Sequence, residues 1–222
     1  MSTFSYSGSQ DSLTILLGSN VGSSLPSDLI ASALENVNDR LHQLAMDPNG
    51  FEKLDFVFDI TNPNAVHDRL SDWANGLFPD TPQILVLDDA AMNGAAGAYS
   101  AERNTIYLSD NIVQRDDLTG LAKVFTEEYG HFLDRQFNPG GDSTGDEGEL
   151  FSNIVLGEEI SDQELARLRG EDDRGTLSLG SIQIEVEQSQ IAIESFNGRL
   201  YQSHRGNDNK IYTRSSTTPF LL

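Results

Sequence analysis

The chain has 222 residues, with 35 Asp and Glu against 14 Lys and Arg, which gives a formal net charge of −21 at pH 7. Hydrophobic residues make up 37% of it, enough for one medium-sized core, so wholesale disorder is not expected. A surface this acidic repels phosphate backbones and anionic lipid, which argues against nucleic acid as a partner. No apolar run approaches the ~20 residues that span a bilayer, so membrane insertion is not predicted.

The chain has no cysteine. Disulfide frameworks, thiolate metal sites and cysteine nucleophiles are therefore ruled out together. The N-terminal residues lack a basic region followed by a long apolar stretch, so a cleaved signal peptide is not predicted. Strong acidity without cysteine favours a protein secreted without a cleaved signal over a cytoplasmic one.

The first ninety residues alternate between strand-like and helix-like segments. Compact apolar runs predict strands at 13–17, 54–60 and 83–87, and the third of these is apolar throughout, as in a central strand. Residues 26–46 carry apolar side chains every three or four positions and predict a helix. Asn62-Pro63 opens a further helix.

The rest of the main domain continues this alternation. Two short strands, 98–100 and 105–108, predict a hairpin. Capping residues and apolar periodicity predict helices at 118–137, 147–156 and 161–168. Strands are predicted at 176–179 and 182–187, the second from its strict alternation of polar and apolar residues. The expected fold class is α/β (α+β): a mixed sheet with helices and a β C-terminal tail.

The character of the chain changes near residue 189. We expect one domain over 1–188 and a β-strand pair over 189–222. The tail resembles one repeat of a β-propeller or lectin-like array, which implies a glycan as its partner. A single copy cannot bury its own faces, so it leans on the main domain or begins a longer array.

The segment 125–134 carries the chemistry. On a helix, Glu127 and His131 are four residues apart and share one face, so both can hold one metal ion. Glu128, the residue after the first ligand, is then aimed at bound water. Gly130 weakens the helix by ~1 kcal/mol relative to alanine, which predicts that another element approaches closely there.

This segment resembles the HExxH helix of zincin metallopeptidases, with glutamate in place of the first histidine. Residues 145–151 resemble the helix on which the gluzincin branch carries its third ligand. The resemblance implies that Glu127, His131 and Glu147 bind the metal and that Glu128 is the general base. The two motifs together are similar to peptidase-like modules of large acidic cyanobacterial repeat proteins.

The hairpin upstream resembles the edge strand with which zincins bind extended substrate. The resemblance implies that this backbone, formed by Thr105, Ile106, Tyr107 and Leu108, pairs with a polypeptide. Tyr129 and Tyr107 are the candidate donors to an oxyanion.

Several alternatives stay open at this point. Asp146 and Glu149 compete with Glu147 as third ligand, and Asp146 is also a natural N-cap. Asp134 either orients the His131 imidazole or replaces a ligand. Without a metal, Glu127 and Glu128 form a solvated face and His131 is a core histidine bonded to Asp134.

The leading prediction is a metal-dependent peptide-bond hydrolase with one divalent ion. Zinc is the ion that the zincin resemblance implies. A ligand set with two carboxylates is harder than a histidine-rich one and shifts the preference towards manganese or iron, which are the alternatives. The alternative is a catalytically inactive zincin-like module that anchors or delivers the C-terminal repeat. A third possibility combines these two functions: a secreted effector or toxin whose main domain is a peptidase and whose tail binds a surface glycan.

Overall fold

The computed structural model describes residues 2–7, 12–17, 27–115, 117–141, 143–189, 192–196, 199–205 and 211–215. The helices are α1 (Ser27–Met46), α2 (Gly50–Phe58), α3 (Pro63–Ala74), α4 (Asp110–Gln114), α5 (Leu118–Phe137), α6 (Glu147–Leu156) and α7 (Asp162–Leu168). No helix in these ranges is long and apolar enough to cross a membrane.

Side-chain caps start the three helices around the candidate site. Asp117, Asp146 and Ser161 each precede a helix and accept a hydrogen bond from the backbone N–H three residues on. These bonds satisfy amide groups that have no partner within the helix. The predicted starts of α5, α6 and α7 are therefore confirmed.

The prediction of a strand at 54–60 is wrong. Residues 54–58 form the second half of α2, whose buried residues include Leu54, Val57 and Phe58. Their spacing of three and four residues places them on one helix face, and this face packs into the core. The apolar run is too short for its period to separate helix from strand, so its packing decided the outcome.

A seven-stranded mixed sheet forms the other layer, with the order β1-β2-β3-β5-β4-β7-β6. Its strands are β1 (Ser2–Ser7), β2 (Ser12–Leu17), β3 (Gln83–Leu87), β4 (Gly97–Ser100), β5 (Thr105–Ser109), β6 (Arg174–Leu179) and β7 (Ile182–Ser189). β2, β3 and β5 run parallel, and the other pairs are antiparallel. The α/β class, the hairpin and the interior position of β3 are confirmed.

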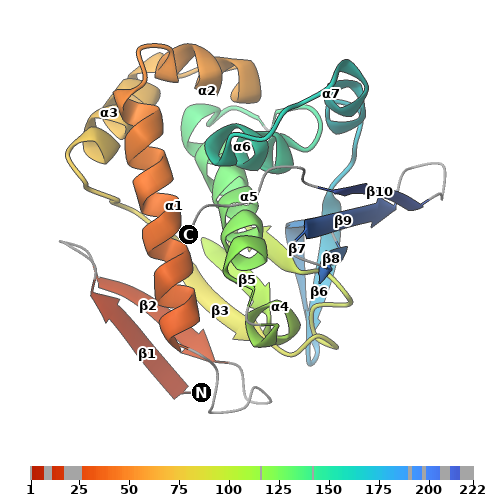
Figure 1. Ribbon diagram of the computed structural model, residues 1–222. Helices are drawn as coiled ribbons and strands as arrows, with labels where there is room; N and C mark the ends of the chain where they lie inside the picture. Colours follow the sequence, from red (N-terminus) through yellow and green to blue (C-terminus); the bar gives the residue numbers. More distant parts are fainter. Residues whose placement is uncertain are drawn as a thin grey trace.

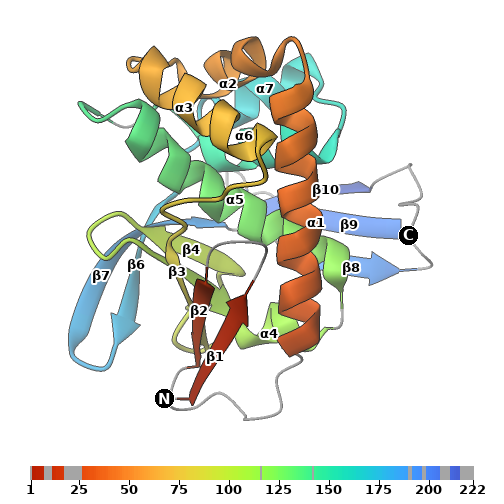
Figure 2. The same ribbon diagram turned by 90° about the vertical axis from the view of Figure 1, so that its left-hand side faces the viewer.

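The helices pack on one face of this sheet. In Figure 2, α2, α3, α6 and α7 gather at the top of the molecule, and α5 runs between them and the strands. The main core joins these helices to Ile84, Tyr99 and Ile106 of the sheet. The opposite face has a smaller core that includes Ala98 and Tyr107. Figure 1 shows α5 at the centre of the molecule, between α1 and the β6–β7 hairpin.

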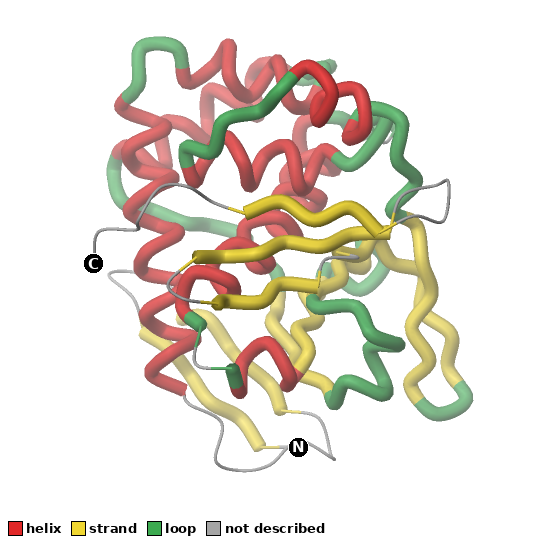
Figure 3. Tube along the Cα trace, turned by 45° about the vertical axis from the view of Figure 1, so that its right-hand side comes forward, coloured by secondary structure: helices red, strands yellow, loops and turns green. Residues whose placement is uncertain are grey.

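The tail forms a separate three-stranded sheet, drawn in the foreground of Figure 3. Its strands are β8 (Ala192–Phe196), β9 (Arg199–Arg205) and β10 (Ile211–Ser215), in the order β10-β9-β8. The predicted strand pair is thus part of a three-stranded meander. Residues 190–191, 197–198, 206–210 and 216–222 of the tail lie outside the described residues, and the repeat-like role of the tail stays a prediction.

Candidate metal centre

His131 lies at the middle of the molecule because α5 is covered on nearly every side. The helix packs against β4, β5 and β7 on one side and against α1, α3 and α6 on the others. Its buried residues include polar ones, and the His131 side chain has no solvent exposure. A buried imidazole requires polar partners, so the elements around α5 decide its chemistry.

Two glycines bring α5 and α6 close together at this point. A β-carbon on Gly130 would lie 2.9 Å from the Cα of Gly148 and 3.2 Å from the Phe151 side chain. A β-carbon on Gly148 would collide with the His131 imidazole and approach the Glu127 carbonyl. The close approach predicted from Gly130 is confirmed, and it places the start of α6 directly beside His131.

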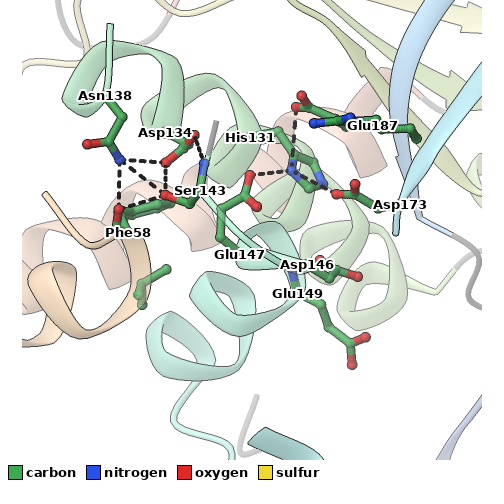
Figure 4. Close-up of polar contacts among 12 residues, drawn as sticks. Phe58, His131, Asp134, Asn138, Ser143, Asp146, Glu147, Glu149, Asp173 and Glu187 are labelled. Atoms are coloured by element: carbon green, nitrogen blue, oxygen red, sulfur yellow. Dashed lines mark hydrogen bonds and ion pairs between the residues drawn. The ribbon is translucent and has the colours of Figure 1, made fainter. Parts of the chain in front are cut away.

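Three carboxylates from three elements surround the Nδ1 atom of His131 (Figure 4). Oε1 of Glu147, in the first turn of α6, lies 2.8 Å away. Oδ2 of Asp173, just before β6, and Oε2 of Glu187, on β7, each lie 3.6 Å away. The 2.8 Å contact is a hydrogen bond, whereas the other two exceed hydrogen-bond distance.

Burial and mutual charge shift the titration of this cluster. Burial by itself lowers the pKa of His131, but Glu147, Asp173 and Glu187 outweigh it and hold that pKa well above the ordinary value. Burial raises the pKa of Glu147, and His131 partly offsets this effect. Burial, followed by the charges of nearby glutamates, raises the pKa of Asp146 well above its usual range. Each shift reflects the free energy of holding excess negative charge away from water.

The cluster fits a divalent cation. The ligand atoms of His131, Glu147 and Glu187 all lie within 4.8 Å of one another, and so do those of His131, Asp146 and Asp173. Two ligand atoms bound ~2.1 Å from one tetrahedral ion lie about 3.4 Å apart, which is close to the spacing seen here. One imidazole nitrogen with carboxylate oxygens is a donor set that suits such ions. This buried group can hold a metal ion.

Both glutamates that precede the histidine are buried, with exposed fractions of 1% for Glu127 and 0% for Glu128. The alternative of a solvated acidic face is therefore wrong. The Glu128 carboxylate packs against Gly97 of β4, where a β-carbon would collide with it. The backbone carbonyl of Glu127 lies against Gly148, so Glu127 is near the start of α6, and its charge raises the pKa of Asp146.

Of the three expected ligands, the structure brings His131 and Glu147 together. The groups within ligand distance found among the described residues do not include Glu127. Asp146 is the N-cap of α6, and its carboxylate also lies within ligand distance of His131, so the capping role is compatible with the ligand role expected for it. Glu149 groups with Asp146 and Glu171 rather than with His131. It is held by Arg167 at 2.6 Å, and Arg167 also binds Glu164 and Glu171 of the α7 region.

Asp134 supports the loop between α5 and α6. Its carboxylate accepts hydrogen bonds from the Asn138 side chain at 2.8 Å and from the backbone N–H of Ser143 at 3.0 Å. Both Asn138 and Ser143 also donate to the carbonyl of Phe58 on α2. Figure 4 shows this network beside the His131 cluster. The network fixes the loop that delivers Glu147 to His131.

The expected substrate strand is not available for pairing. β5, which carries Thr105, Ile106, Tyr107 and Leu108, is bonded on one side to β3 and on the other to β4. Its backbone groups are thus already used within the sheet. The outer edge of β4 is likewise taken by β7. The expectation that residues 105–108 bind a peptide backbone is corrected for this reason.

The two tyrosines expected near the reaction lie elsewhere. Tyr129 is buried among Trp73, Phe125 and Phe132, and Tyr107 belongs to the small core on the far face of the sheet. Tyr99 of β4 is instead the tyrosine beside the cluster. Its burial, together with the charge of Glu187, raises its pKa to about 12, so its hydroxyl keeps its proton at neutral pH.

Asp173 and Glu187 are the site residues that the sequence did not predict. A weak signal for Glu187 exists in the alternation of residues 182–187, which places it on the polar face of β7. Direct register with Tyr99 on β4 turns that face toward α5. Nothing local marks Asp173, because its position depends on where the β6–β7 hairpin joins the sheet.

Comparison with models of protein families, with curated proteins and with solved structures gave no match for this chain. Functional inference therefore depends on the site itself.

Proposed function

We propose that the protein is a zinc-dependent hydrolase of peptide bonds, with the ion held by His131, Glu147 and Glu187. The observation that supports this is the buried His131 Nδ1 atom with three carboxylate oxygens within 3.6 Å. One imidazolium cannot balance three buried carboxylates, whereas a divalent cation reduces the excess charge. Manganese or iron is compatible with the same donors.

The second part of the proposal is a general base on the same helix as His131. A bound divalent ion polarises a carbonyl and acidifies water. Glu128 is buried on α5, three residues before His131, and is the proposed base. In the reaction, water oxygen bonds to the carbonyl carbon, the C–N bond breaks, and Glu128 carries the water proton to the leaving amine.

A second candidate is a structural metal site in a non-catalytic binding module. It is favoured by the presence of Asp173 at the same distance from His131 as Glu187. Four protein ligands would close a tetrahedral site, and catalytic zinc sites keep one position open. Activity therefore has to be measured separately from metal content.

The test compares wild type with His131→Ala and Glu128→Gln, purified without chelator or metal-affinity resin. Elemental mass spectrometry is expected to find about one zinc per wild-type chain, none in His131→Ala, and wild-type content in Glu128→Gln. Hydrolysis of a mixed peptide library is expected only in wild type. Wild type without metal after incubation with zinc, manganese and iron would refute the proposal, and metal without hydrolysis would support the structural site.

A further inference from the structure

A cavity of about 640 Å³ adjoins the candidate metal centre. Its walls come from the β6–β7 hairpin, from the turn after β4 and from the last turns of α5. Glu187 belongs both to this cavity and to the cluster around His131. The charged and aromatic residues that line it are Tyr99, Glu102, Arg135, Arg174, Glu185 and Glu187.

One wall is a row of three side chains across neighbouring strands. Arg174 on β6 lies opposite Glu187 on β7, and Glu187 lies opposite Tyr99 on β4. Directly opposed residues point to the same face, and strands are ~4.8 Å apart, so the three side chains form a continuous surface. Arg174 thus borders the cavity one strand away from a proposed metal ligand.

The facing wall contributes a second guanidinium. Arg135 is four residues after His131 on α5, so it projects from the same side one turn further along. It is solvent-exposed, and none of the ion pairs found within the described residues includes it. Arg167 is a contrasting case, since it is neutralised by three glutamates. Arg135 therefore presents its charge to the cavity.

We propose that Arg135 and Arg174 bind a carboxylate of the substrate and that the protein selects peptides with a carboxylate next to the scissile bond. The proposal rests on the hydrolase function above. Guanidinium groups bind carboxylates with two parallel hydrogen bonds, which gives both affinity and orientation. Because one residue of extended chain spans ~3.5 Å and one helical turn rises ~5.4 Å, a carboxylate held one turn from His131 belongs to a residue within one or two positions of that bond.

The carboxylate has two sources, an acidic side chain or the C-terminus of the peptide. Glu102 and Glu185 also line the cavity, so a preference for basic peptides is the opposite outcome. Four fluorescent alanine pentapeptides separate these cases. One has a free C-terminus, and the other three are amidated, with an all-alanine, a glutamate-containing or a lysine-containing sequence.

Fluorescence anisotropy measures their binding to the wild-type protein, both metal-free and zinc-loaded. We expect the free-acid peptide, the glutamate peptide or both to bind at least about tenfold more tightly than the neutral amide. The peptide that shows the preference identifies the carboxylate. Arg135→Gln is expected to abolish the preference and Arg174→Gln to reduce it, whereas Arg40→Gln on α1 leaves it unchanged.

Equal binding of all four peptides, no binding of any, tighter binding of the lysine peptide, or a preference that survives Arg135→Gln would each overturn the proposal. Zinc content is measured on the same samples. A chain that binds no metal but prefers carboxylates refutes the hydrolase function alone. A chain that binds zinc without this preference refutes the carboxylate site alone. Thermal unfolding by circular dichroism checks that each variant is folded.

Discussion

His131 and the carboxylates around it hold more negative charge than one imidazolium can balance. Glu147 is its closest partner, and Asp173 and Glu187 complete the set from the β6–β7 hairpin. These side chains are all buried. Buried charge of one sign is unfavourable unless a counter-charge or protons reduce it, so the cluster favours either a cation or bound protons.

At the scale of single residues, Glu187→Gln tests the ligand set. Loss of a group that hydrogen-bonds to a metal ligand weakens metal binding by ~10–100-fold. Loss of a ligand carboxylate itself is therefore expected to weaken zinc binding at least as much. Glu185→Gln is the matched control, because it lies two residues away on the same strand and is exposed. Competition with a fluorescent zinc chelator measures both affinities. Equal affinities in the two variants would remove Glu187 from the ligand set.

At the scale of elements, the crossing of α5 and α6 positions the site. The two helices meet at Gly130 and Gly148, where their backbones approach too closely for a side chain. This contact places the first turn of α6, with Asp146 and Glu147, against the imidazole of His131. The loop before α6 is held in turn by Asp134, Asn138 and Ser143.

Gly148→Ala is expected to disturb this crossing. The added methyl group would displace the His131 ring and separate the helices, at a cost of about 1–3 kcal/mol in the free energy of unfolding. Zinc affinity is expected to fall with it, because the imidazole moves away from Glu147. Gly140→Ala is the control, since a β-carbon there meets nothing within 4 Å. Urea unfolding midpoints measure the difference, and equal midpoints for the two variants would contradict the packing argument.

At the scale of the whole molecule, excess negative charge links stability to pH. In the metal-free protein, the pKa values of His131, Asp146 and Glu147 are all raised above their ordinary values. The folded state then binds more protons than the unfolded chain, so the free energy of unfolding falls as pH rises. For His131 this stability is fully present below its ordinary pKa of 6.5 and is lost as pH passes its raised value.

The melting temperature of metal-free protein is therefore expected to fall from about pH 6 to about pH 8. Zinc replaces the bound protons, so the increase in melting temperature on zinc addition is expected to grow over the same range. Differential scanning calorimetry in ~0.5 M salt measures both quantities. The salt screens those of the charges behind the net −21 that lie at the surface, so the pH dependence that remains comes from the buried cluster. A zinc effect that does not change with pH would contradict this linkage.

The local features of the chain were sufficient to predict much of the fold. The bounds of α5 and α6, the capping residues Asp146 and Ser161, and the hairpin of β4 and β5 follow from nearby residues alone. Helix caps and apolar periodicity act within a few residues, so a single sequence contains them. The segment of α2 lacked such a signal, and its burial against the core selected a helix.

The residues of the candidate site also fall into two groups, those predicted from the sequence and those seen only in the structure. The sequence by itself placed His131 and Glu128 on one helix and Glu147 in the first turn of the next. Only the tertiary structure decided that Asp173 and Glu187 complete the cluster, that both edges of β5 are occupied and that Arg135 faces a cavity. The cluster and the cavity depend on the β6–β7 hairpin pairing with β4, and the edges of β5 are filled by β3 and β4. Such pairing between distant segments is set by the packing of the whole domain rather than by local pattern.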